Sequence, residues 1–100
     1  MDELFVQFGE QGVKRIIFYG ASELAEIAYI SLQGFSIDLV AIIDEAKVGE
    51  SFLGYVISDF SKAKIVEFDK CLITASDYSV EVCEHLTSKG FHLAKITLLQ

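Results

Sequence analysis

The chain has 100 residues, which is enough for one domain with a buried core and too short for two. Acidic residues outnumber basic ones by 15 to 8, and the resulting net charge of −7 argues against direct nucleic-acid contact by this domain. No apolar run approaches the roughly 20 residues that cross a bilayer, and the acidic residues 2–3 are unlike a secretory signal. We therefore expect a cytoplasmic domain without membrane contact.

The first predicted element is a short amphipathic helix over residues 2–11. Leu4, Phe5 and Phe8 fall on one side of it, and Gly12 is well placed as the left-handed residue that ends it. We expect this apolar side to pack on the same domain or on a second copy. Residues 1–12 are thus predicted as an N-terminal connecting helix.

A strand, a second helix and a second strand follow in the first half. Residues 13–19 contain a continuous apolar run, which is typical of a strand buried on both faces of a parallel sheet. Apolar residues then recur at helical spacing over 24–32 until Gly34 ends the helix. The apolar residues 39–43 predict the next strand.

The second half continues the alternation. The predicted elements are a short strand at 55–57, a helical turn within 58–64, a strand at 71–75, a helix at 80–87 closed by a glycine, and a last strand at 93–99. Strands that alternate with helices of this length are joined by right-handed crossovers into a parallel sheet. For residues 13–100 we therefore predict an α/β domain of Rossmann-like, three-layer type. Its parallel sheet has about five strands, in the order 3-2-1-4-5.

The turn after the first strand overlays a dinucleotide-binding fingerprint. Residues 20–25 match G-x-G-x-x-G/A, with Gly20 kept, Ala25 as the allowed alanine and Ser22 in place of the second glycine. Asp44 ends the second strand 24 residues after Gly20, close to the spacing of the acid that holds ribose hydroxyls. The predicted cofactor-binding residues are Gly20, Ala21, Ser22, Glu23, Leu24, Asp44, Thr74, Ser76 and Asp77.

Each of these residues also has a purely structural interpretation. Ser22 can cap its helix, Asp44 can open a turn, and Ser76 or Asp77 can cap the following helix. A side chain at Ser22 keeps the backbone away from a pyrophosphate. Glu23 competes with a bound anion at the helix N-terminus.

No catalytic or metal-binding pattern is complete. None of the four tyrosines has a lysine four residues later, and the chain has no P-loop and no nucleophile elbow. Cys71 and Cys83 do not form a C-x-x-C pair, and His85 and His92 have no metal-ligand spacing. We predict no catalytic residue and no metal ligand.

Four segments carry a family resemblance. KRIIFYGASELAEIAYISLQG, DLVAIID, VGESFLGYVI and CLITASD resemble the Rossmann-like domain of polysaccharide-locus proteins. These include the N-terminal domain of sugar O-acyltransferases and the CoA-binding-like domain of polysaccharide biosynthesis proteins. YGASELAEIAYISLQ is more similar to the C-terminal half of bacterial winged-helix transcriptional regulators linked to exopolysaccharide genes, a layout shared with NAD(H)-binding redox repressors.

The resemblance implies a non-catalytic ligand-sensing or regulatory domain. Its ligand would be NAD(H), another nucleotide or a nucleotide-sugar, and its partner an attached domain, a second copy of the chain or both. A nucleotide-sugar-binding domain of a polysaccharide-modifying enzyme is the alternative. A ligand-free interaction module is the third interpretation.

Overall fold

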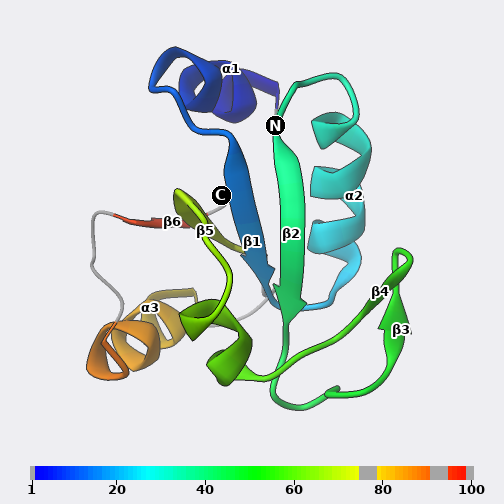
Figure 1. The fold of residues 1–100 in the computed structure, drawn as a ribbon, viewed down its shortest axis with the longest axis vertical. Helices are drawn as coiled ribbons and strands as arrows, with labels where there is room; N and C mark the ends of the chain where they lie inside the picture. The colour runs from blue at the N-terminus through cyan, green and yellow to red at the C-terminus, as the bar shows by residue number, and fades with distance from the viewer. Residues whose placement is uncertain (1, 75–78, 91–94, 99–100) are drawn as a thin grey trace.

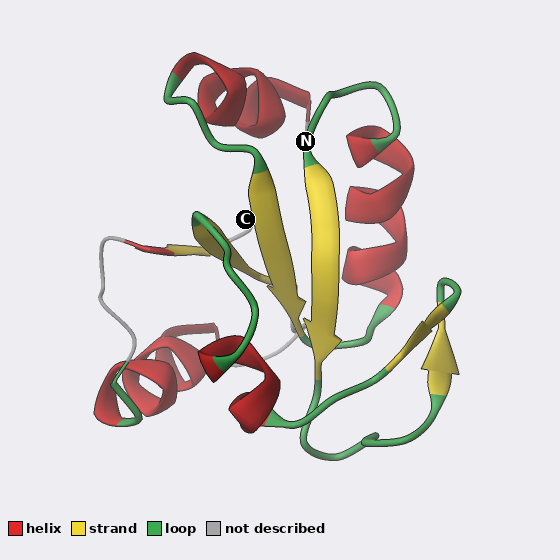
Figure 2. Cartoon of the chain, in the orientation of Figure 1, coloured by secondary structure: helices red, strands yellow, loops and turns green. Residues whose placement is uncertain are grey.

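The computed structural model describes residues 2–74, 79–90 and 95–98 (Figures 1 and 2). The elements in chain order are α1 (Asp2–Glu10), β1 (Arg15–Tyr19), α2 (Glu23–Leu32), β2 (Asp38–Ile43), β3 (Ser51–Phe52), β4 (Tyr55–Val56), the 3-10 helix η1 (Phe60–Lys64), β5 (Lys70–Ile73), α3 (Ser79–Ser88) and β6 (Ile96–Leu98). No helix in these ranges is long and apolar enough to span a membrane.

The main sheet contains four parallel strands in the order β2-β1-β5-β6. The α/β class and the parallel sheet are as expected from the sequence. β1 lies in the middle of the sheet, with β2 on one side and β5 on the other. The order of the strands therefore reverses at β1: the chain first adds β2 on one side of β1 and later adds β5 on the other side.

The expected third strand does not join this sheet in the described part of the chain. β4 pairs antiparallel with β3, and only an isolated bridge between Ile43 and Ser58 links the segment to β2. The turn between β3 and β4 has two residues, Leu53 at φ 53° and Gly54 at φ 82°. Two positive φ angles in a two-residue loop are the geometry of a tight hairpin, which explains why these strands pair with each other.

Helices cover both faces of the sheet, so the domain has three layers (Figure 1). Successive β1 residues point to opposite faces: Ile16 and Phe18 enter the core under α1 and α2, and Ile17 enters the core under η1 and α3. All three side chains are fully buried. Burial on both faces accounts for the continuous apolar run of β1.

The helix α1 packs on this domain, as one of the two alternatives expected. Phe5 and Phe8 are buried, and the Phe5 ring lies 5.7 Å from the ring of Phe35, centroid to centroid. The Ser31 hydroxyl in α2 donates a hydrogen bond to the Asp2 carboxylate. Gly12 ends the helical segment at φ 79°, as predicted. The helix α1 is therefore part of the core on this face of the sheet.

Gly34 follows α2, as expected, but it does not have the left-handed conformation that is common at helix ends. α2 ends at Leu32 with Gln33 still helical, and Gly34 is not among the positive-φ residues. The N–H groups of Gln33 and Gly34 bond to Ile30 and Ser31 in a tightened last turn, so no left-handed residue is needed there. Gly90, after α3, does have a positive φ of 102°.

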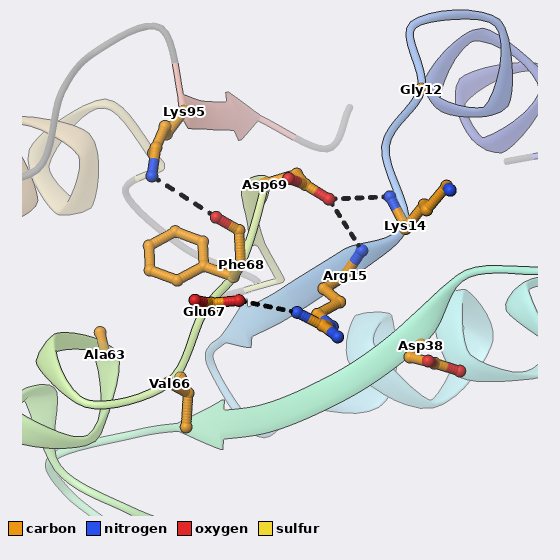
Figure 3. Close-up of a pocket in the computed structure, with 10 residues that line it drawn as sticks. All are labelled: Gly12, Lys14, Arg15, Asp38, Ala63, Val66, Glu67, Phe68, Asp69 and Lys95. Atoms are coloured by element: carbon orange, nitrogen blue, oxygen red, sulfur yellow. Dashed lines mark hydrogen bonds and ion pairs between the residues drawn. The ribbon is translucent and has the colours of Figure 1, made fainter.

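A polar hollow of about 840 Å³ opens at the amino edge of the sheet (Figure 3). The Asp69 carboxylate joins the starts of β5 and β1 by accepting hydrogen bonds from the backbone N–H groups of Lys14, at 2.8 Å, and Arg15, at 3.1 Å. Arg15 also pairs with Glu67 at 2.9 Å. That pair is exposed and contributes little to stability.

Protonating Asp69 should weaken the fold. The N–H groups of Lys14 and then Arg15 hold the pKa of the Asp69 carboxyl below its ordinary value. A lowered folded-state pKa stabilises the protein above the unfolded-state value of about 3.9, and this contribution disappears as pH falls through the folded-state pKa. Urea unfolding between pH 6 and pH 2.5 should show a shallower loss of stability for Asp69→Asn than for the wild type. Identical pH slopes would contradict this role of Asp69.

Candidate functional site

The turn after β1 is buried and has a backbone that favours glycine. Gly20 has φ 117°, and its N–H donates to the carbonyl of Ile43 at 2.8 Å, which continues the β1–β2 ladder beyond the strand. The Gly20 carbonyl accepts a 2.6 Å hydrogen bond from the hydroxyl of Thr74, a fully buried residue after β5. The turn is thus tied to both neighbouring strands at the carboxyl edge of the sheet.

Ser22 caps the helix α2. Its Oγ accepts a hydrogen bond from the backbone N–H of Leu24 at 3.2 Å, and its hydroxyl donates to the carbonyl of Thr74. The structural interpretation of Ser22 is therefore confirmed. The same side chain fastens the start of α2 to the end of β5.

Asp44 lies beside the turn, where the spacing of the motif placed it. One carboxylate oxygen accepts the backbone N–H of Ala21 at 3.0 Å, and the other accepts the N–H of Ala46 at 3.1 Å. The second bond opens the turn after β2, which was the structural alternative for this residue. The first has a functional consequence, because an N–H group in front of a helix N-terminus is a natural donor to an anion. Here the protein's own carboxylate occupies that donor.

Lys47 brings a positive charge to the same place. Its Nζ donates to the carbonyl of Ala21 at 2.7 Å from the loop between β2 and β3. Lys47 was not among the predicted site residues, since a lone lysine in a loop belongs to no motif. Its separation of three residues from Asp44 is the only sequence signal that relates it to the site.

Tyr19, the last residue of β1, is a second residue that the motif did not identify. Burial raises the pKa of its hydroxyl, and the negative charges of Glu45 and Asp44 raise it further. The hydroxyl therefore remains a neutral hydrogen-bond donor at physiological pH. Tyr19 adds a donor near two carboxylates at the carboxyl edge.

The structure brings together five of the predicted cofactor-binding residues: Gly20, Ala21, Ser22, Asp44 and Thr74. Glu23 is exposed in the first turn of α2, and Leu24 is half-buried against the core. Ser76 and Asp77 lie outside the described residues.

The described residues contain no group of three His, Cys, Asp or Glu side chains that could hold a metal ion. Cys71 is fully buried in β5. What the site offers is a set of hydrogen-bonding groups of both charges around a helix N-terminus.

A comparison with known families matches most of the chain. The model of the family described as C2185-like, N-terminal, matches residues 12–97, which is most of the chain. The comparison with curated proteins found no match.

Proposed function

The chain belongs to the C2185-like, N-terminal family, and we propose that it is a non-catalytic ligand-sensing domain with a Rossmann-like fold. Its ligand is a nucleotide, a dinucleotide such as NAD(H), or a nucleotide-sugar, bound at the carboxyl edge of the sheet. Binding there changes the position of an attached domain or of a second copy of the chain. The domain acts in the cytoplasm.

The observation that carries this proposal is the meeting of four groups at one edge. The Gly20 turn, the Asp44 carboxylate, the Thr74 hydroxyl and the Lys47 ammonium lie within a continuous set of hydrogen bonds. Ligands of open parallel sheets bind outside the carboxyl ends of the strands, where the strand order reverses. In this chain that place lies beyond the hydrogen-bonded ends of β1 and β5, beside the Gly20 turn.

The charges at the edge favour weak binding of a phosphate. Asp44 already accepts the N–H of Ala21, and Glu23 adds a second negative charge at the start of α2. A helix N-terminus favours an anion by only about 0.3–1 kcal/mol, which these carboxylates can cancel. Lys47 supplies the opposing charge. We therefore expect micromolar or weaker affinity for a nucleotide.

Substituting the two charged residues should move this affinity in opposite directions. Lys47→Gln removes an ammonium beside the turn and should weaken binding about five-fold, whereas Glu23→Gln should tighten it about two- to five-fold. Calorimetry with NADH and with UDP-glucose gives both values. Lys62→Gln, on η1, removes the same charge away from the turn and serves as the control. Equal effects of Lys47→Gln and Lys62→Gln would place the phosphate elsewhere.

A ligand screen tests the proposed function itself. A ligand at one hundred times its Kd stabilises a folded domain by about 2.7 kcal/mol, which raises Tm by several degrees. NADH or UDP-glucose at millimolar concentration should therefore raise Tm in a concentration-dependent way. A flat response to both would favour the ligand-free interaction module.

A second candidate is the nucleotide-sugar-binding domain of a polysaccharide-modifying enzyme. The word "N-terminal" in the family description favours a domain that precedes another unit, as in the sugar O-acyltransferases that the sequence resembles. The regulator layout has the reverse order. A winged helix encoded upstream would support the sensing domain of a regulator, and a hexapeptide-repeat domain encoded downstream would support the enzyme.

A further inference from the structure

A second pocket, with both apolar and basic side chains in its lining, lies on the other side of the sheet from α2. It has a volume of about 190 Å³ and is located between η1, the end of α3 and the start of β6. Its lining includes the apolar residues Phe60, Ala63 and Phe68 and the basic residues Lys64, Lys89 and Lys95. It shares no lining residue with the turn at Gly20, so it is a separate candidate site.

Aromatic rings hold the three ammonium groups around this pocket. The Nζ atoms of Lys64 and Lys89 lie 5.7 and 5.4 Å from the centre of the Phe60 ring. The Nζ of Lys95 lies 4.9 Å from the centre of the Phe68 ring, an arrangement visible in Figure 3. A ring face attracts a cation but carries no net charge. The amines are therefore gathered in one place without being neutralised by the rings.

Only one of the three lysines has an ion-pair partner in residues 2–74, 79–90 and 95–98. Lys89 pairs with Glu45 at 3.3 Å. Lys64 has no such pair, and Lys95 donates only to the uncharged carbonyl of Phe68 at 3.4 Å. Two positive charges thus face a small pocket in a chain whose net charge is −7.

The overall negative charge does not cancel this local effect. At physiological ionic strength, exposed charges farther apart than about 8 Å are largely screened from each other. A bound anion therefore interacts mainly with the nearest charges. Lys64, Lys89 and Lys95 line the pocket. The carboxylates nearby include Glu45, which is paired with Lys89, and Asp69, whose charge interacts with that of Lys95. The acidic residues on the other faces weaken long-range attraction, which disfavours a long polyanion more than a small one.

We propose that this pocket binds a small molecule through an anionic oxygen group, either a phosphate ester or a carboxylate. Lys64 and Lys95 contact the anion. The rings of Phe60 and Phe68 position the two ammonium groups and give an apolar wall to the rest of the ligand.

The test is a titration of the full chain at constant ionic strength with ribose 5-phosphate, inorganic phosphate and citrate. Amide chemical shifts should move saturably around Phe60, Phe68 and Gly90. A response to the two phosphates alone identifies a phosphate site, and a response to citrate alone identifies a carboxylate site. Shifts that rise linearly without saturation, for all three probes, would overturn the proposal.

Matched variants locate the binding. Lys64→Gln and Lys95→Gln should each raise Kd about five-fold, the effect of losing one nearby charge in water, and Lys64→Arg should restore most of the affinity. Lys62→Gln and Lys14→Gln remove the same charge outside the pocket and should leave Kd within two-fold of the wild-type value. Equal losses in all four glutamine variants would mean non-specific ion attraction and would overturn the site.

Discussion

Replacing Phe5 with alanine should lower the free energy of unfolding by about 3–5 kcal/mol, because the Phe5 side chain is fully buried between α1 and the sheet. Its ring contacts those of Phe8, at 6.0 Å, and Phe35, at 5.7 Å, between centroids. Removing it leaves a cavity and removes one ring contact from both Phe8 and Phe35. A domain of this size has a total stability of about 5–15 kcal/mol, so the loss is a large part of it.

Urea unfolding measures this loss, with Val6→Ala as the matched control. Val6 lies next to Phe5 on the same helix, and its side chain is 48% exposed, so the control should change stability by less than about 0.5 kcal/mol. Phe5→Leu keeps an apolar side chain and should remain folded if the alanine variant does not. Equal stabilities for Phe5→Ala and Val6→Ala would show that α1 is not docked on this core.

Replacing Gly20 with valine should also be costly. The φ of 117° at Gly20 lies in the region that side-chain-bearing residues rarely adopt, and the residue is buried and bonded to both neighbouring strands. Strain of this kind costs about 1–3 kcal/mol. For a domain of this size, we expect Tm to fall by about 5–15 °C.

Gly9→Ala is the control for this substitution. Gly9 lies within α1, and a Cβ added there meets no atom within 4 Å. Alanine is a better helix former than glycine, so Gly9→Ala should leave Tm unchanged or raise it slightly. A Gly20→Val variant that melts like the wild type would mean that the turn can relax to an ordinary φ.

The main sheet could be predicted from the sequence because burial on both faces leaves a clear pattern. The runs at 15–19 and 38–43 are almost continuously apolar, and α2 between them follows helical spacing. The short strand expected at 55–57 is present as β4, but its residues carry no signal of which strand they pair with. The turn at Leu53 and Gly54 determines that β4 pairs with β3. Leu-Gly is not one of the dipeptides that are typical of a tight hairpin, so the sequence does not predict this turn.

The candidate site was predictable only to the extent that it follows a motif. Gly20 and Asp44 were expected together, and they are joined through Ala21. The motif does not predict which N–H groups bond to the two carboxylate oxygens of Asp44, because that depends on the conformation of the loop that begins at Ala46. Lys47 reaches the turn across 26 residues of sequence, a contact that no local pattern encodes.

The outer position of β2 has a consequence for self-association. An outer strand presents backbone groups that can template pairing with another chain, which leads to aggregation. Here the Tyr55 hydroxyl donates a hydrogen bond to the carbonyl of Leu39 at 2.6 Å, and the N–H of Ser58 donates one to the carbonyl of Ile42 at 3.0 Å. β4 and the residues directly after it thus bond two of the outward carbonyls of β2. β2 has β1 as its neighbour on one side, and these two hydrogen bonds on its other side hinder pairing with a strand of another molecule.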